Sequence, residues 1–341
     1  MAGKSRGTPF RVVAAYDTET CNVGTGPDTR AYPILFILND FTDVPLEEYE
    51  PDDPRETVIF DRTLDTFMPR LLNLMDAGRR NGYVPVVCAY NLMFDMQPLM
   101  AAFAGVAVLK LNAQSSTNVY TIDVYANQQD ADNDGRPLMR FWDTFFLEQN
   151  GLKAMGETAG VAKATGDWDY SKIRTPETPL TDLELFYAKR DVQVIPAYLR
   201  YLLRSNEWMT SDMLGSRVLT KTSTVRQMAL HTFGSVRVGE SKGKRRAPTM
   251  LRKFEYLCHD ELPKDYDTYA LRKACFRGGF TFTSAAFATK CMQGVVSVDV
   301  TSMHHTFING RMIPVGFTRM SAADLQYLAD RVVRTPLRDV L

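Results

Sequence analysis

Two carboxylates near the start of the chain stand where they could hold a metal ion. Asp17 and Glu19, in "YDTET", follow the apolar run at residues 11–16, "RVVAAY". Alternate residues of a strand share a face, so both side chains leave the same side. Like charges this close repel each other, and a cation between them would cancel the repulsion. An Asp-x-Glu pair alone is weak support, because a chain with 40 acidic residues contains such pairs by chance.

Two later segments add acids of the same kind. "NLMFD", residues 91–95, puts Asp95 just past the end of an expected strand, where open α/β sheets carry ligand sites. "YAKRD", residues 187–191, puts Tyr187 and Asp191 one helical turn apart, so they point the same way. Asp191 has apolar neighbours, among which an unpaired acid is costly. Taken singly, Asp95 reads as a loop acid and Asp191 as a helix-surface acid.

Together these side chains predict metal-dependent hydrolysis. Carboxylate oxygens are the hard ligands that Mg²⁺ and Mn²⁺ prefer, and four of them can hold two such ions. Two ions about 4 Å apart activate a water and stabilise the leaving oxygen when a phosphodiester is cleaved. The hydroxyl of Tyr187, one turn before Asp191, could orient that water.

The elements that must position these residues are strands and helices in alternation. Short β-rich runs at residues 11–16, 32–38, 56–60 and 83–91 predict strands, the first ending at the acids. Helical spacing predicts a helix over 64–78, stopped by Gly78, and a second over 98–106. Residues 112–140 suggest a hairpin with a polar tip at 128–135. This order favours an α/β or α+β sheet with helices packed on it.

From residue 146 the chain reads as helical. Thr181 and Glu184 fit the S/T-x-x-E capping box, so the longest helix should begin near residue 181. We place a domain boundary near residue 230. A basic segment follows, which reads either as a solvated linker or as a surface for DNA or a partner protein. Strand-rich sequence resumes at 276.

Composition limits the class of protein. A chain of 341 residues favours two domains, and a net charge of zero says nothing about binding to polyanions. The five cysteines show no spacing typical of zinc sites, which indicates reduced thiols and a cytoplasmic setting. No apolar run approaches the ~18 residues of a membrane span, so neither export nor membrane insertion is expected.

The motifs "YDTET", "AYNLMFD" and "YAKRD", in this order, resemble the three exonuclease motifs of DnaQ-type proofreading exonucleases, in the version found in family B DNA polymerases. The resemblance implies an RNase H-like fold, an α/β mixed sheet with flanking helices, and Mg²⁺- or Mn²⁺-dependent 3′→5′ removal of nucleotides. The implied metal ligands are Asp17, Glu19, Asp95 and Asp191, with Tyr187 orienting the water. The implied contacts to a single-stranded 3′ end are Thr20, Asn91 and Phe94, the last as a stacking face.

Further along, "FRGGFT", residues 276–281, resembles the YRGG motif of protein-primed family B polymerases of small phages. In that family the segment lies between exonuclease and palm and helps to pass the primer end between them. The residue types suit this role, because Arg277 can pair with phosphate. Gly278 and Gly279 let the backbone approach a strand closely.

"SVDVTSMHH", residues 297–305, resembles polymerase motif A. The resemblance implies that Asp299 is a metal ligand of the palm and that Ser302 is the motif's serine. His304 stands where the family usually has a tyrosine that stacks under the incoming sugar. It is therefore a candidate DNA-binding residue, and its replacement of the tyrosine is expected to alter the selectivity for the sugar. Residues 276–341 are therefore expected to form the start of an α+β palm, after an exonuclease domain at 1–230 and a basic connection at 231–275.

The sequence departs from the family in two ways. A lysine that serves exonuclease catalysis in the family precedes the stretch resembling "GDWDY", but here that position is Thr165. Either Lys163 reaches the site, or the assisting cation is missing and cleavage is slower. The second palm carboxylate and the nucleotide-binding helix of the family do not occur before Leu341. The chain is thus expected to be part of a split polymerase or a truncated product.

The leading hypothesis is a proofreading 3′→5′ exonuclease fused to the opening of a protein-primed polymerase palm. Its partners would be single-stranded 3′ ends, primer-template DNA, a terminal protein and a second chain that completes the polymerase. One alternative is a non-catalytic subunit that binds DNA or terminal protein in a multi-chain replicase. Another is a free-standing nuclease outside replication, against which the segments at 276–281 and 297–305 argue.

Overall fold

The fold is taken from a computed structural model, which describes residues 8–24, 28–115, 117–161, 168–237, 249–250 and 252. The chain separates into two compact units, Met1–Thr232 and Phe233–Leu341. Every element below lies in the first unit, apart from the last residues of helix α7. The domain limits proposed from the sequence stay a prediction.

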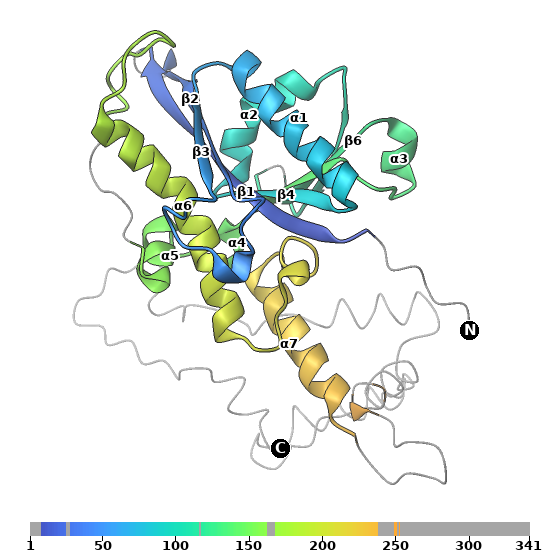
Figure 1. The fold of residues 1–341 in the computed structure, drawn as a ribbon. Coiled ribbons are helices and arrows are strands. Elements are labelled where there is room, and N and C mark those ends of the chain that lie inside the picture. Colours follow the sequence, from blue (N-terminus) through green and yellow to red (C-terminus); the bar gives the residue numbers. More distant parts are fainter. Residues whose placement is uncertain are drawn as a thin grey trace, which may run out of the picture. The chain divides into compact units, whose positions relative to one another are not determined.

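A seven-stranded mixed sheet forms the centre of the first unit, with its strands in the order β3-β2-β1-β4-β7-β6-β5. Figure 1 labels β1, β2, β3, β4 and β6 of this sheet. Strand β1 pairs in parallel with β4, and β4 with β7, while the remaining neighbours are antiparallel. The strands are β1 Phe10–Val23, β2 Arg30–Asp40, β3 Thr57–Asp61, β4 Val84–Ala89, β5 Val108–Ala113, β6 Val119–Tyr125 and β7 Met139–Asp143.

Helices cover both faces of this sheet, which confirms the predicted α/β class with a mixed sheet and flanking helices. One core joins Tyr16 and its neighbours on β1 to α1 and α2, and the other joins the opposite face of β1 to α5 and α6. The helices are α1 Leu64–Asn81, α2 Leu92–Phe103, α3 Gln128–Asp132, α4 Phe145–Glu148, α5 Leu152–Ala159, α6 Asp182–Ser205 and α7 Lys221–Ser235, with the 3-10 turns η2 Leu46–Glu48 and η3 Ser211–Met213.

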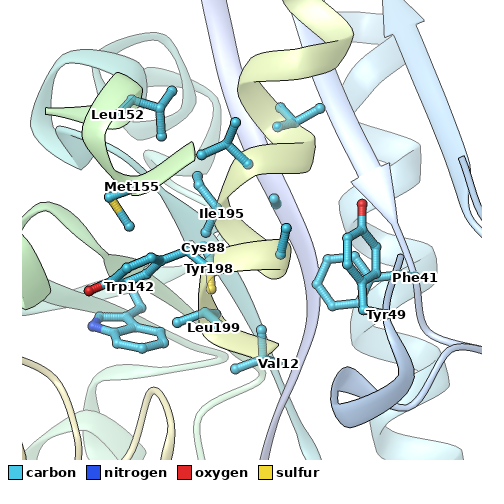
Figure 2. Packing of buried hydrophobic residues seen from close by; sticks show 14 of the residues in the cluster. Val12, Phe41, Tyr49, Cys88, Trp142, Leu152, Met155, Ile195, Tyr198 and Leu199 are labelled. Atoms are coloured by element: carbon cyan, nitrogen blue, oxygen red, sulfur yellow. The ribbon is translucent and has the colours of Figure 1, made fainter. Parts of the chain in front are cut away.

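The second core holds α6 against the strands. Figure 2 shows Ile195 and Tyr198 of α6 packed with Met155 of α5 and with Trp142 of β7. Trp142 is fully buried, and its indole N–H donates to the carbonyl of Leu219 at 3.1 Å. Burial of this much apolar surface fixes the rotation of α6 about its axis, and so the direction in which its polar residues point.

Strand β1 is longer than the sequence suggested. We expected the strand over residues 11–16, ending at the acids, but it continues to Val23 because β2 stays paired with it over that length. Asp17 lies opposite Ile37 and Glu19 opposite Leu35, and the register shifts between Glu19 and Thr20. The two acids therefore lie inside a paired strand, whose backbone hydrogen bonds hold them more rigidly than a loop would.

The limits predicted for α1 were wrong at one end. The helix runs through Gly78 and ends at Asn81, and the capping residue Gly82 takes the left-handed conformation with φ 76°. Gly78 serves packing instead, since a Cβ there would lie 2.5 Å from the side chain of Pro85 and 2.8 Å from the carbonyl oxygen of Tyr83. No side chain fits in that space.

Helix α2 begins at Leu92, six residues before the predicted start at residue 98. Pro98 suggested a first helical position, but it lies inside the helix, where burial of Leu92, Met96 and Leu99 outweighs the lost backbone hydrogen bond. Asp95 is consequently in the first turn of a helix and not in a loop.

Two other predictions hold. Thr181 and Glu184 form the capping box at the start of α6, with both reciprocal hydrogen bonds present. Strands β6 and β7 form the predicted hairpin, with the short helix α3 at its polar tip. Among the helices of the described residues, none is long and apolar enough to cross a membrane.

Candidate functional site

Three of the four predicted acids come together. Asp17 and Glu19 of β1 and Asp191 of α6 place one carboxylate oxygen each within 4.8 Å of one another. Glu19 and Asp191 are only 2% and 5% exposed. Three hard oxygen donors in a partly buried cluster fit a divalent cation such as Mg²⁺ or Mn²⁺, which would also balance their charge.

Asp95 lies beside this cluster but is not one of its three members. It comes from α2, and its Oδ1 accepts hydrogen bonds from the backbone N–H of Thr18, at 3.2 Å, and from the Thr18 hydroxyl. Burial, and next the charge of Asp17, raise the pKa of Asp95 well above its usual range, although the bonds from Thr18 lower it. The carboxyl is thus tied to β1 from the helix side.

The acids open onto a cavity of about 300 Å³. Asn91 and Phe94, from the start of α2, also line it, and Phe94 is 44% exposed. Asn91 takes the left-handed conformation, with φ 64°, as the residue that caps α2. Thr20, the third predicted contact, is buried, lies outside this lining and offers its carbonyl to the indole N–H of Trp168 at 3.1 Å.

Two tyrosines, Tyr170 and Tyr187, line the cavity together with the acids. Tyr187 lines the cavity, as the motif suggested, and hydrogen-bonds to Tyr170, which the sequence analysis did not single out. The Tyr170 hydroxyl also lies 3.4 Å from Glu19 Oε2. Burial raises the pKa of both phenols well above the usual range, and the nearby carboxylates raise it further. Both hydroxyls keep their protons at neutral pH and can donate hydrogen bonds.

The segment that carries Tyr170 is held in place by a buried ion pair. Arg174 Nη2 lies 2.5 Å from Glu184 Oε1 at the start of α6, and the arginine side chain is 1% exposed. The guanidinium also lies over the ring of Trp168, 4.7 Å from its centroid, and donates to the carbonyl of Asp169 at 2.6 Å. The only signal in the sequence was the position of Tyr170 at the end of "GDWDY".

Asp143, at the end of β7, is a buried acid that sequence reasoning missed. It is 4% exposed, and its carboxylate accepts from three backbone N–H groups, those of Asn91 at 3.1 Å, Leu92 at 3.0 Å and Phe145 at 2.9 Å. It thereby caps α2, whose own capping residue makes no side-chain cap hydrogen bond. Local spacing could not reveal this cap, because it comes from another strand.

Asp143 makes stability depend on pH. Burial raises its pKa to about 6, against the opposing effect of the three N–H groups. Because the pKa of Asp143 is higher in the folded than in the unfolded chain, this group stabilises the fold fully at pH values below its unfolded pKa. The contribution to the free energy of unfolding, about 3 kcal/mol in all, is lost as pH rises through about 6. We expect urea unfolding in EDTA to show this decline between pH 4 and 7, and Asp143→Asn to remove it. The exposed Asp132→Asn is the control, and equal pH profiles for unaltered chain and Asp143→Asn would contradict the assignment.

Several predicted residues lie outside the described part of the chain. They are Lys163, Thr165, Arg277, Gly278, Gly279, Asp299, Ser302 and His304. The predictions for the palm segment and for the assisting lysine therefore stay predictions. Among the residues described, the site consists of Asp17, Glu19 and Asp191, with Asp95, Tyr170 and Tyr187 around the cavity.

Comparison with protein-family models gives no match, and none is found among curated proteins. Among solved structures the chain is similar to phi29 DNA polymerase complexed with primer-template DNA and incoming nucleotides, at 15% identity and a TM-score of 0.49, covering 81% of this chain and 41% of that one. The same polymerase with single-stranded DNA matches at 14% identity and a TM-score of 0.46, over 80% and 41%. The chain thus spans about two-fifths of the polymerase chains it matches.

Proposed function

We propose that this chain is the 3′→5′ exonuclease part of a protein-primed family B DNA polymerase, which hydrolyses the 3′-terminal phosphodiester of a DNA strand. One observation carries the proposal. Asp17, Glu19 and Asp191, from two segments far apart in the sequence, bring their oxygens within 4.8 Å of one another at a cavity that Asp95 and Tyr187 also line.

The donor set determines what the site would hold. Asp17, Glu19 and Asp191, with Asp95 beside them, would bind Mg²⁺ or Mn²⁺ through carboxylate oxygens. When bound, such ions activate water and neutralise the charge that develops on the leaving oxygen.

The chain's own residues position the reactants. Tyr187 keeps its proton and donates a hydrogen bond to a water in the cavity, while its partner Tyr170 holds the phenol in place. The N-terminal turn of α2 faces the same cavity, with Asn91 as a hydrogen-bonding group and Phe94 as an exposed ring. An aromatic ring beside a hydrolytic site suits a single strand whose bases are unpaired.

The wider setting follows from the sequence motifs. The proposed partners are a single-stranded 3′ end, primer-template DNA, a terminal protein and a second chain that supplies the rest of the polymerase. The palm metal ligand would be Asp299, with Arg277, Gly278, Gly279, Ser302 and His304 near the primer. Within the exonuclease part, Lys163 is the candidate for the assisting cation.

The direct test is degradation of a single-stranded oligonucleotide labelled at its 5′ end, with Mg²⁺, with Mn²⁺ and with EDTA. We expect stepwise shortening from the 3′ end with either metal, none with EDTA, and none with Asp191→Ala. The exposed Asp212→Ala should cleave like the unaltered chain. Binding without cleavage under all conditions would contradict the proposal and favour the non-catalytic DNA-binding subunit.

Phe94 provides a prediction about binding. Phe94→Ala should weaken binding of a single strand in Ca²⁺ by about 1–3 kcal/mol, because one base loses its stacking partner. Phe94→Tyr keeps the ring and should bind normally. Fluorescence anisotropy with a labelled oligonucleotide measures both. Unchanged affinity in Phe94→Ala would show that the ring has no role in binding.

A further inference from the structure

Thr18 lies between the two acids of β1, on the opposite face of the strand, and also contributes to the lining of the cavity. Because alternate residues of a strand share a face, Thr18 follows Tyr16, whose ring stacks on Phe67 of α1 at a centroid distance of 5.2 Å. Asp17 and Glu19 face α6 instead, where they meet Asp191. Thr18 is therefore buried on the α2 side of the strand, directly beneath Asp95.

The contacts of Asp95 come largely from this strand. Its Oδ1 receives the backbone N–H of Thr18 at 3.2 Å and the Thr18 hydroxyl. Its backbone carbonyl receives the Tyr16 hydroxyl at 3.0 Å. Asp143 holds the start of the same helix from β7 through the N–H groups of Asn91 and Leu92. The helical turn that carries Asp95 is thus held from two strands.

These contacts give the two carboxylate oxygens of Asp95 different roles. Oδ1 is engaged by Thr18, whereas Asp95 also lines the cavity with the three clustered acids. The oxygen not bound to Thr18, Oδ2, is the one that can act in the cavity. A carboxyl group that could rotate freely would not present the same oxygen to the cavity each time.

We propose that Thr18 is the positioning residue that holds Asp95 as the fourth carboxylate of the metal centre, by binding Oδ1 so that Oδ2 faces the cavity. This inference rests on the proposed metal site. It gives a role to Thr18, to which the comparison of the three acidic motifs assigned none. Partners of metal ligands that fix ligand orientation commonly account for 10–100-fold in metal affinity or activity, an order-of-magnitude range. A threonine suits the position because it favours strand backbone and carries a hydroxyl.

The test is Mn²⁺ binding to the full chain without DNA, measured by calorimetry. We expect Thr18→Val, which keeps the shape of the side chain but removes the hydroxyl, to lower Mn²⁺ affinity at the lower-affinity site by about 10–100-fold. Thr18→Ser keeps the hydroxyl and should bind nearly as the unaltered chain does. Thr18→Ala serves as a second hydroxyl-free variant if the valine disturbs packing, with near-ultraviolet circular dichroism as the check on folding.

A double variant separates this role from a general structural effect. If Thr18 acts through Asp95, then Thr18→Val should change Mn²⁺ affinity little once Asp95→Asn is present, because the two effects are coupled. Equal Mn²⁺ binding by Thr18→Val and the unaltered chain would overturn the inference. So would an unreduced effect of Thr18→Val in the Asp95→Asn chain, or no Mn²⁺ binding at all.

The result is distinguishable from failure of the proposed function. A chain that binds Mn²⁺ with the expected dependence on Thr18, yet releases no nucleotide from any 3′ end, would keep the positioning role and remove the exonuclease. If the Thr18→Val variant releases nucleotides normally at every Mn²⁺ concentration and binds Mn²⁺ with unchanged affinity, the exonuclease proposal stands and the positioning role of Thr18 is removed.

Discussion

Replacing Asp17 and Glu19 together by alanine should abolish nucleotide release while the fold stays intact. Both carboxylates lie on one face of β1, within 4.8 Å of the Asp191 carboxylate at the nearest oxygens. Removing two of three clustered ligands leaves too little negative charge to hold a divalent cation. A loss of 4 kcal/mol or more in transition-state stabilisation corresponds to a rate reduction of about a thousandfold or more.

The same variant should be more stable than the unaltered chain when metal is absent. Like charges held close in the folded state repel each other, and the unfolded chain relieves that repulsion. We therefore expect a higher Tm for the double variant in EDTA, and no rise in its Tm when Mn²⁺ is added, because binding to the folded state is lost. The unaltered chain should gain stability with Mn²⁺.

A double variant with the same spacing provides the control. Asp130→Ala with Asp132→Ala removes two acids from the polar tip of the β6–β7 hairpin. This control should cleave and respond to Mn²⁺ as the unaltered chain does. Normal nucleotide release by the Asp17 and Glu19 variant would remove the proposed mechanism altogether.

The largest effect on stability should come from Arg174→Met. The guanidinium of Arg174 is buried against Glu184, and its loss leaves a buried carboxylate without its ion-pair partner. Breaking a buried pair on one side costs about 3–5 kcal/mol. For a folded unit of this size that corresponds to a fall in Tm of roughly 6–20 °C. Thermal unfolding followed by circular dichroism measures it.

The pH dependence of this variant offers a second readout. Burial alone would raise the pKa of Glu184, but hydrogen bonds from Thr181 and Arg174 hold it below its usual range. A lowered pKa contributes stability that is present above the pKa of the unfolded chain and is lost as pH falls. The unaltered chain should therefore lose more stability than Arg174→Met does below pH 4.5, the ordinary value for the group.

Two controls test whether the buried pair is the cause. Arg55→Met breaks an ion pair with Asp53 on the surface, where solvent screens the charges, and should lower Tm much less than Arg174→Met does. Adding Glu184→Gln to Arg174→Met removes the unpaired charge and should restore part of the lost stability. A drop in Tm for Arg174→Met no larger than that for Arg55→Met would show that the pair is not a structural anchor.

The relative directions of the candidate site residues could be predicted from the sequence. The spacing of Asp17 and Glu19 followed from strand alternation, and that of Tyr187 and Asp191 from the helical turn. The capping box at Thr181 predicted where α6 begins, and the structure confirms it. These predictions succeeded because each depends on residues a few positions apart, whose relative directions are set by the backbone period of 2.0 or 3.6 residues.

Only the tertiary structure decided how these parts meet. β1 continues past its acids because β2 pairs with it, and Asp95 belongs to a helix because apolar burial outweighs the signal of Pro98. The division of Asp95 from the three clustered acids, and the cap that Asp143 supplies from another strand, arise from contacts between residues about fifty to eighty positions apart. Such contacts leave no periodic pattern along the chain, because packing between distant elements determines them.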